Sequence, residues 1–442
     1  MPTSHVPRGA ALLALALSAS ACQTYDFEPV KPLSIGQTQT STDIAAVANK
    51  PNFMLLVDKS GSMDQPVDAT IPACHVGGIN GPLCGDPQKS NPCNTAVCPT
   101  RWSELTKALD NYIAQYPLIG RYGLSLFPEP ESNGGCGPTS KQTSSLPTSP
   151  ADDDATLQGA ADATRAALDA VKSSNPPGPT GTGGGTPTAA SLAFLVSVPQ
   201  LVSDNTREQI VILFTDGLPN CTGDPAVQDL AGTVACQCTF GPALDDCAPS
   251  IPPYKGAGCL DVDQAVKAVQ VLAERKVQTY VVGFGAEAGT ATARDTLQRI
   301  AVSGDVRFPR ICPGTPPNQP CGSDNPCDLA TGRCTKQYYQ ANDASSLGEV
   351  LKQITAPVAG VCERPLTEVP TDVSLLSVLV NGTAIQPGPE TWVYVPPGST
   401  TSVNALPGPA VEFVAGKPTC EQLKASTGAN PVSVQIRILK VL

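Results

Sequence analysis

Residues 53–63 read Phe-Met-Leu-Leu-Val-Asp-Lys-Ser-Gly-Ser-Met, and this stretch decides the fold. Its five apolar residues predict a short buried strand, bounded by a turn that is rich in serine and glycine. The strand ends at Asp58, and Ser60 and Ser62 follow it. A carboxylate and two hydroxyls that leave one strand end together are the oxygen ligands that a hard cation such as Mg²⁺ prefers. On its own this pattern is a weak signal, because serine turns after strands are common.

Two later stretches add to this signal. A run of glycines precedes Thr186 and Thr188 and leads into an apolar helix that we expect over Ala189–Val198. Residues 210–217 read Ile-Val-Ile-Leu-Phe-Thr-Asp-Gly, a second buried strand that ends next to a carboxylate, Asp216. In the order and context of these three segments the sequence resembles the von Willebrand factor type A (vWA) family. That family combines an Asp-x-Ser-x-Ser strand end, a threonine after a glycine-rich loop and a Thr-Asp-Gly strand end.

The resemblance covers roughly residues 50–358 and implies a metal-ion-dependent adhesion site. Carried over residue by residue, its ligands are Asp58, Ser60, Ser62, Thr186 and Asp216. Thr188 is the alternative to Thr186, which is favoured because the family's threonine directly follows the glycines. The implied cation is Mg²⁺, or another divalent ion such as Mn²⁺ or Ca²⁺. Its open coordination position would take an Asp or Glu carboxylate from a protein partner, which is recognition without catalysis.

Strands and helices alternate through residues 51–358, which predicts an α/β fold: a doubly wound, mostly parallel sheet with helices on both faces, as in Rossmann-like domains. Further strands are expected over Tyr122–Phe127, Val277–Val282 and Val306–Pro309, and further helices over Asp152–Lys172, Ala291–Ile300 and around Leu347–Ile354. Such sheets bind ligands beyond the carboxyl ends of their strands, which is where Asp58 and Asp216 lie. Without a cation between them, we expect these two carboxylates to repel each other.

Three cysteine-rich loop insertions are expected within this domain, at about residues 65–100, 218–259 and 310–336. Beyond it, residues 359–442 have the pattern of a small β domain. Short alternating stretches there predict strands, and Asn381-Gly382 predicts a hairpin turn between two of them. A disulfide between Cys362 and Cys420 is the one that this domain can form by itself. Nothing in this segment indicates a chemical role.

The N-terminal residues 1–21 carry a single full charge and an apolar segment, which predicts a secretory signal peptide. The small residues that run into Cys22 resemble a bacterial lipobox, which implies a lipidated Cys22 and an anchor in the cell envelope, at the outer membrane or the cell surface. The alternative is ordinary cleavage near Ala21, with Cys22 free or paired. Residues 22–50 are polar and lack periodicity, so we expect a flexible tether.

The cysteine count supports secretion. The chain has 17 cysteines, and setting Cys22 aside leaves 16, an even number suited to disulfides in an oxidising compartment. They form groups of four over 74–98, five over 221–259 and four over 312–334, with two more in the β domain. Cys136 stands alone and the 221–259 group is odd. We therefore predict that Cys136 pairs with a member of that group, with Cys221 as the first choice.

Composition narrows the function. The net charge is −11 and no Lys/Arg cluster stands out, which argues against nucleic acid as a partner. Of the two histidines, His5 leaves with the signal peptide, and neither a Gly-x-Ser-x-Gly nor a His-Glu-x-x-His motif is present. We therefore expect that the protein is not an enzyme, and no motif in the sequence indicates a small-molecule substrate. The predicted function is metal-dependent binding of a protein ligand in the cell envelope. The alternatives are an envelope assembly scaffold with a mainly structural metal and, less favoured, a paired-carboxylate hydrolase.

Overall fold

The computed structural model describes residues 37–38 and 50–441, apart from 86–90, 130–134, 172–183, 205–206, 240–243, 249–254, 307–308, 313–317, 323, 360–361, 367–368, 371, 397–408, 415, 425–431 and 439. The predicted signal peptide, the predicted lipidation site Cys22 and most of the predicted tether lie outside the described residues. Within the described part, none of the helices has both the length and the apolar character needed to span a membrane.

The larger part of the chain is built on a five-stranded sheet with strand order β3-β2-β4-β5-β8. The strands are β2 (Asn52–Asp58), β3 (Arg121–Phe127), β4 (Gln209–Thr215), β5 (Val277–Phe284) and β8 (Tyr339–Ala341). All four neighbouring pairs are parallel, and the first four strands are buried along their whole length. A fully buried parallel strand needs apolar residues at every position, which is why these segments are continuous runs rather than alternating ones.

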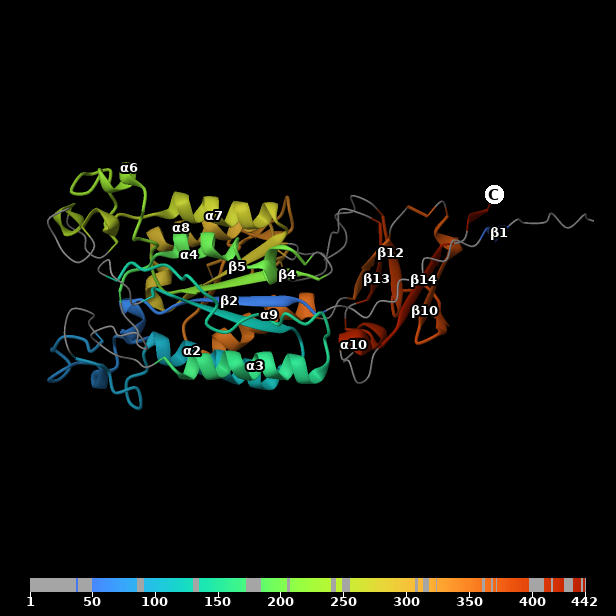
Figure 1. The fold of residues 1–442 in the computed structure, drawn as a ribbon, viewed down its shortest axis with the longest axis horizontal. Coiled ribbons are helices and arrows are strands. Elements are labelled where there is room, and N and C mark those ends of the chain that lie inside the picture. The colour runs from blue at the N-terminus through green and yellow to red at the C-terminus, as the bar shows by residue number, and fades with distance from the viewer. Residues whose placement is uncertain are drawn as a thin grey trace, which may run out of the picture.

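Helices cover both faces of the sheet (Figure 1). One face carries α2 (Arg101–Gln115), α3 (Asp154–Asp169) and α9 (Ala344–Ala359), and the other carries α4 (Thr188–Leu195), α7 (Val262–Glu274) and α8 (Ala291–Val302). Successive side chains of a strand point to opposite faces. Leu55 therefore packs in the core with α2, α3 and α9, while its neighbours Met54 and Leu56 pack with α4, α7 and α8. The predicted doubly wound architecture is confirmed.

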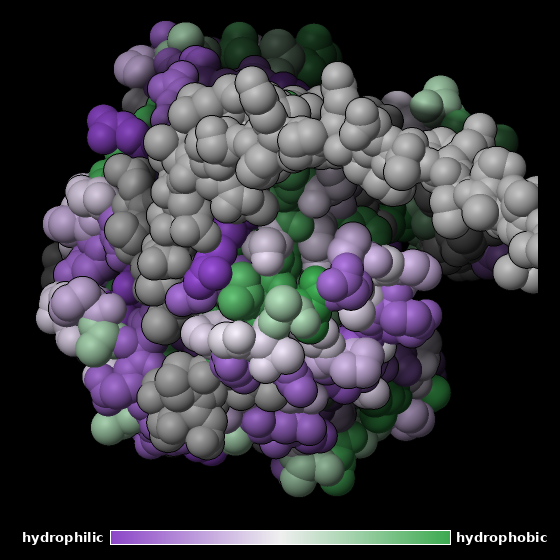
Figure 2. Space-filling model, turned by 90° about the vertical axis from the view of Figure 1, so that its right-hand side faces the viewer, coloured by the Kyte–Doolittle hydropathy of each residue, from purple (hydrophilic) through white to green (hydrophobic). Residues whose placement is uncertain are grey.

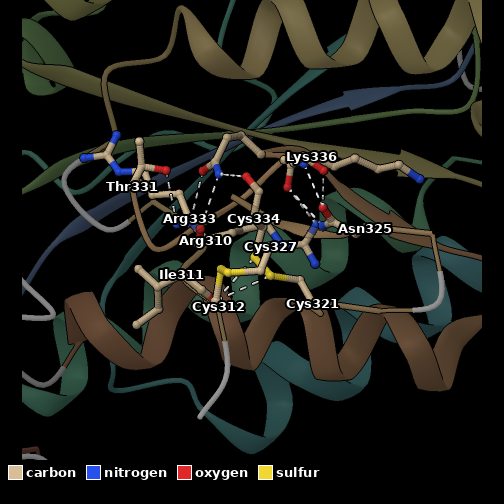
Figure 3. The surroundings of a disulfide bond; sticks show 12 residues. Arg310, Ile311, Cys312, Cys321, Asn325, Cys327, Thr331, Arg333, Cys334 and Lys336 are labelled. Carbon is tan, nitrogen blue, oxygen red and sulfur yellow. Dashed lines mark hydrogen bonds between the residues drawn. A yellow bond between two sulfur atoms is a disulfide. The ribbon is translucent and has the colours of Figure 1, made fainter. Parts of the chain in front are cut away.

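The predicted strand over Val306–Pro309 is wrong. Val306 and Pro309 lie outside any strand, and the two residues between them lie outside the described part of the chain. The edge of the sheet is formed instead by β8, whose Tyr339 pairs with Val282 of β5. The reason is the third insertion, which Figure 3 shows with its two disulfides side by side. The Arg310 guanidinium lies 4.7 Å from the centre of the Tyr339 ring, so the chain before the insertion packs beside β8 instead of taking its place in the sheet.

Disulfides join all 16 cysteines that follow Cys22. The pairs are Cys74–Cys98, Cys84–Cys93, Cys136–Cys221, Cys236–Cys259, Cys238–Cys247, Cys312–Cys327, Cys321–Cys334 and Cys362–Cys420. The predictions of Cys136–Cys221 and Cys362–Cys420 are confirmed. Since every other cysteine is paired, no cysteine of this chain remains for Cys22.

The short elements lie mainly in or near the insertions. They are η1 (Gly61–Asp64), η2 (Pro72–Cys74), α5 (Pro199–Val202), α6 (Pro225–Gln228), η3 (Leu244–Cys247), η4 (Lys255–Gly258), η5 (Ala286–Gly289), β6 (Cys327–Asp328) and β7 (Arg333–Cys334). Disulfides, rather than an extensive hydrophobic core, hold such loop-rich segments in place. In the first and second insertions the small buried clusters consist largely of cysteines.

The C-terminal segment forms two three-stranded antiparallel sheets, ordered β11-β10-β14 and β12-β13-β9. Its elements are β9 (Glu363–Pro365), η6 (Val373–Leu375), β10 (Leu376–Val380), β11 (Thr383–Ile385), β12 (Trp392–Val395), β13 (Ala410–Phe413), α10 (Pro418–Lys424), β14 (Val434–Ile438) and β15 (Lys440–Val441). Asn381 and Gly382 both have positive φ angles, 50° and 77°, and form the tight turn between β10 and β11. The predicted small β fold and its hairpin are therefore present.

Residues 37–38 of the predicted tether form a two-residue strand, β1, that pairs antiparallel with β15. At these two residues the chain is thus held by the C-terminal strands rather than free. Figure 1 shows β1 and the C-terminus together at one end of the molecule, while the first two cysteine-rich insertions lie at the other end. Figure 2 views the molecule from the end that carries β1, where a small hydrophobic area is surrounded by hydrophilic side chains.

Candidate metal centre

The two carboxylates singled out by the sequence lie at adjacent strand ends. Asp58 is the last residue of β2, Asp216 follows β4 directly, and β2 and β4 are paired. From β2 the chain moves to β3 on one side and returns to β4 on the other, so the strand order reverses between them. In open α/β sheets this switch point is where ligands bind. Both aspartates are completely buried.

Hydrogen bonds join four of the five predicted ligands. Ser62 Oγ donates to Asp216 Oδ1 at 2.8 Å, and the Ser60 and Ser62 hydroxyls lie 3.1 Å apart. The Ser60 backbone N–H donates to Asp58 Oδ1 at 2.8 Å, while Thr215 Oγ1 donates to Asp58 Oδ2 at 2.7 Å. Each carboxylate oxygen has two lone pairs, so one such bond leaves it able to accept a further ligand. The oxygens therefore converge in a network that a cation can enter.

The glycine-rich loop brings Thr186 to the same end of the sheet. Gly61 N–H donates to the Gly184 carbonyl at 3.0 Å, which ties the loop after β2 to the loop before α4. The Thr186 N–H donates to Asn220 Oδ1 at 2.7 Å, and the Asn220 N–H donates back to the Thr186 carbonyl at 2.9 Å. Thr188 Oγ1 points back at the Thr186 carbonyl, 3.5 Å away, as the first residue of α4. The geometry is thus compatible with Thr186 as the threonine ligand, which stays a prediction.

A close backbone approach explains one glycine of this loop. Gly184 has a φ of +90°, and a Cβ at this position would lie 2.5 Å from the Gly135 carbonyl oxygen. The Gly185 N–H donates to the same carbonyl at 3.0 Å. The neighbouring disulfide, Cys136–Cys221, joins the loop after β3 to the loop after β4. Backbone contacts and a covalent bond therefore hold the loops around the two aspartates.

The structure adds a residue that we did not predict, Arg101. It is the first residue of α2, its side chain is 6% exposed, and its Nη1 lies 2.6 Å from Asp216 Oδ2. The same nitrogen lies 3.4 Å from the carbonyl oxygen of Ser62. A cation at the first position of a helix is unfavourable to the helix dipole. The unfavourable position of Arg101 at the start of a helix is the one signal in the sequence that its charge is compensated by a carboxylate elsewhere in the fold. Asn220 had no such signal.

Burial, and after it the nearby charge of Asp216, raise the pKa of Asp58 to about 7, against the hydrogen bonds from Thr215 and Ser60, which lower it. A buried pair of carboxylates is unfavourable without compensating positive charge. Arg101 compensates Asp216 in part. A divalent cation with a preference for oxygen ligands would compensate both, so the residues present fit such an ion.

A pH dependence follows for the metal-free protein. The pKa of Asp58 is about 7 in the folded state against 3.8 for an ordinary aspartate, so the folded state binds the extra proton between these values. We therefore expect the free energy of unfolding to rise as the pH falls from about 7 to about 4.5, by up to about 1.4 kcal/mol per pH unit. This contribution is lost above pH ~7. Urea unfolding in EDTA across this range measures it.

The matched control is Asp261, whose pKa burial raises to about 6. Asp58→Asn should remove the slope between pH ~6 and ~7, whereas Asp261→Asn should reduce only the part below pH ~6. Equal slopes for the wild type and Asp58→Asn would mean that Asp58 is ionised in the metal-free fold.

A second group of possible metal ligands does not form a site. The sulfur atoms of Cys84, Cys93 and Cys98 lie within 4.8 Å of one another. All three are in disulfides, to each other or to Cys74. A metal binds the thiolate, which a disulfide does not offer. Among the described residues, the aspartate and hydroxyl cluster is therefore the stronger metal candidate.

Comparison with known proteins gave matches among solved structures alone. No protein-family model and no curated protein matches the chain. The pilus adhesin SpaC from Lactobacillus rhamnosus GG is 13% identical over 89% of this chain and 40% of its own, with a TM-score of 0.39. This chain thus spans less than half of SpaC. The manganese-loaded TRAP protein of Plasmodium vivax is 15% identical over 79% of this chain and 92% of its own, with a TM-score of 0.34.

The SpRpn10 VWA domain is also among the similar structures, at 10% identity over 58% of this chain and 83% of its own, with a TM-score of 0.27. The resemblance to a vWA domain rests on the chain itself: the sheet order, the buried strand ends and the loops that meet at Asp58 and Asp216. In its motifs and in its fold, the chain resembles a vWA domain.

Proposed function

We propose that the chain binds a divalent cation between Asp58 and Asp216 and, through that cation, a carboxylate of a protein partner. The observation that carries the proposal is the convergence of two fully buried carboxylates at the switch point of the sheet. They are linked through hydrogen bonds of Ser62, which contacts Asp216, and of Ser60, which contacts both Ser62 and Asp58. Two buried carboxylates are unfavourable without compensating positive charge, and their oxygens are the ligands that a hard cation prefers.

The chemistry of the donor set selects the ion. Two carboxylates and three hydroxyls, from Asp58, Asp216, Ser60, Ser62 and Thr186, are all oxygen ligands, which suit Mg²⁺, Mn²⁺ or Ca²⁺ and not a soft metal. Five protein ligands leave at least one position of a six-coordinate ion open. The chain's residues would hold and orient the ion. The ion would supply positive charge next to two buried carboxylates.

The open position supports recognition. A bound divalent ion is the largest local charge in such a site and attracts an anionic group from outside. A carboxylate on a partner protein offers the hard, anionic oxygen that Mg²⁺ or Mn²⁺ takes at an open position. The eight disulfides suit a protein that works in an oxidising compartment. The proposed setting is the bacterial cell envelope, with a lipid on Cys22.

The position of β1 fits that setting. The strand pairs with β15, at the end of the molecule opposite the first two insertions (Figure 1). A lipid anchor on Cys22, which precedes β1 in the sequence, would place this end of the molecule toward the membrane. The metal centre would then face away from the membrane. Detergent partitioning tests the anchor: the wild type should enter the detergent phase and Cys22→Ser should not. A wild-type protein found wholly in the aqueous phase, with an unmodified thiol at Cys22, would contradict it.

Water-proton relaxation with Mn²⁺ tests the binding proposal. We expect one Mn²⁺ per chain with at least one exchangeable bound water, and we expect acetate or a glutamate-containing peptide to displace that water. Asp58→Asn should abolish the relaxation change caused by bound Mn²⁺. Asp110→Asn, which breaks an ion pair between α2 and α3 with Arg165, should leave that change as in the wild type. Mn²⁺ binding without any effect of carboxylates would favour the scaffold with a structural metal, and no Mn²⁺ binding would end the proposal.

A further inference from the structure

Arg101 is built into the metal centre rather than lying beside it. Its Nη1 reaches Asp216 Oδ2 at 2.6 Å and the Ser62 carbonyl at 3.4 Å, so one guanidinium contacts the loops after β4 and β2. Gly285, which directly follows β5, has a φ of +85°, and a Cβ there would lie 3.2 Å from the Arg101 Cδ and Nε atoms. The absence of a side chain at Gly285 thus leaves the space in which the arginine lies.

Hydrogen bonds also fix the backbone of Arg101 at the start of α2. Thr100 caps α2 in a reciprocal pair of hydrogen bonds with Ser103, so the first turn of the helix is well defined. The Arg101 N–H donates to the Gln65 carbonyl at 3.0 Å. A long cationic side chain that is 6% exposed, anchored at both ends and set on a buried carboxylate is not a surface residue in a chance contact.

The two carboxylate oxygens of Asp216 accept hydrogen bonds from different donors. Oδ1 accepts from the Ser62 hydroxyl and Oδ2 accepts from Arg101. A divalent ion that binds Asp216 therefore enters a site where one unit of positive charge is already in contact with the same carboxylate. Positive charges a few ångströms apart at low effective dielectric repel strongly. Once the ion is bound, the same arginine adds to the positive charge that an incoming carboxylate meets.

We propose that Arg101 is a resident counter-cation of this centre, which weakens divalent-cation binding and strengthens carboxylate binding once the cation is in place. The inference rests on the proposed function. It assigns Arg101 a positioning and electrostatic role, not a ligand's role. Its consequence is a centre that loads only at raised divalent-cation concentration and, when loaded, holds an anionic partner more tightly.

Mn²⁺ titration followed by electron paramagnetic resonance tests this, with acetate binding to the loaded protein as a second measurement. Arg101→Gln should tighten Mn²⁺ binding by about tenfold or more, because a neighbouring positive charge is removed. The same variant should weaken acetate binding to the loaded site, by about 3- to 10-fold. The two changes have opposite signs, which a general loss of structure would not produce.

Two variants control for charge and for fold. Arg101→Lys keeps the charge and should bind Mn²⁺ nearly as the wild type does. Arg165→Gln removes a charge at an ion pair with Asp110 and should change neither affinity by more than about twofold. In the unaltered protein, the nitrogen resonance of the Arg101 guanidinium should shift on Mg²⁺ loading, a readout that needs no substitution.

The outcomes separate the two proposals. Mn²⁺ binding by the wild type with unchanged or weaker binding by Arg101→Gln overturns the role of Arg101 and leaves the metal centre intact. Tight binding by Arg101→Gln alone, with none by the wild type, supports the role of Arg101 and contradicts metal-dependent function in the native protein. Binding by neither variant overturns both. A guanidinium resonance that does not respond to Mg²⁺, in a protein that binds it, also counts against the inference.

Discussion

Asp216→Ala should abolish divalent-cation binding and should also destabilise the metal-free protein by about 3–5 kcal/mol. The first effect follows because Asp216 is one of only two carboxylates in the proposed ligand set. The second follows because the substitution leaves the Arg101 guanidinium buried without the carboxylate that it contacts at 2.6 Å. Chemical unfolding in EDTA measures the stability, and calorimetric titration with Mg²⁺ measures the binding.

The opposite end of the sheet offers a matched control. Asp152 is another aspartate with arginine partners, and its side chain is 8% exposed. Arg121 and Arg207 each donate to its Oδ1 at 2.9 Å. Asp152→Ala should cost a similar amount of stability, about 3–5 kcal/mol, and should leave Mg²⁺ affinity unchanged. An Asp216→Ala protein that still binds Mg²⁺ as the wild type does would contradict the assigned site. A metal-free Asp216→Ala protein as stable as the wild type would contradict the role given to the ion pair.

The stability effect reverses what the sequence alone predicts. From two facing aspartates we expect repulsion in the metal-free protein, and removal of one should then relieve it. The negative charge of Asp216 does act on Asp58, whose pKa it raises in addition to the larger effect of burial. However, Arg101 contacts Asp216 from the start of α2, far from either motif in sequence. The cost of leaving that arginine unpaired exceeds the relief, because an uncompensated buried charge is the more expensive of the two.

The second large effect concerns the Cys136–Cys221 disulfide. Replacing both cysteines with serine should lower the free energy of unfolding by about 4.6 kcal/mol in the chain-entropy model, because the bond closes a loop with a sequence separation of 85. It should also weaken Mg²⁺ binding, since the bond links the loops after β3 and β4 near Asp216. Unfolding curves and Mg²⁺ titrations of the oxidised variants measure both effects.

The Cys84–Cys93 disulfide serves as the control, because it lies in the first insertion and has a sequence separation of only 9. Its replacement by two serines should cost about 2–3 kcal/mol by the same model and should not change Mg²⁺ affinity. Equal losses of affinity in the two variants would show that the insertions act on the metal centre in general, and not through the link between Cys136 and Cys221.

The sequence predicts the sheet well because its signals are local. A parallel strand buried on both faces must be apolar throughout, so the runs at Phe53 and Ile210 are visible without knowledge of their neighbours. The polar residues that follow them mark the strand ends, and parallel strands bring such ends to one edge. Cysteine parity predicts the Cys136–Cys221 pair for a similar reason, since a lone cysteine and an odd group leave few other solutions.

Contacts that depend on three dimensions leave little trace in the sequence. Arg101 and Asn220 act through bonds to Asp216 and Thr186, and nothing in their immediate neighbours specifies those bonds. The edge strand was misplaced because the third insertion separates the chain near Val306 from β8, the segment that completes the sheet. A short edge strand has a weak pattern, and long-range packing decides which of two candidates forms it.

The most direct test of the central claim is anomalous diffraction from crystals of the full chain grown with Mn²⁺. The account predicts one strong anomalous peak between the carboxylates of Asp58 and Asp216, within coordination distance of the Ser60 and Ser62 hydroxyls, with at least one position filled by water or by a carboxylate of a neighbouring molecule. Crystals with fully occupied Mn²⁺ elsewhere and no peak between these two aspartates would contradict it.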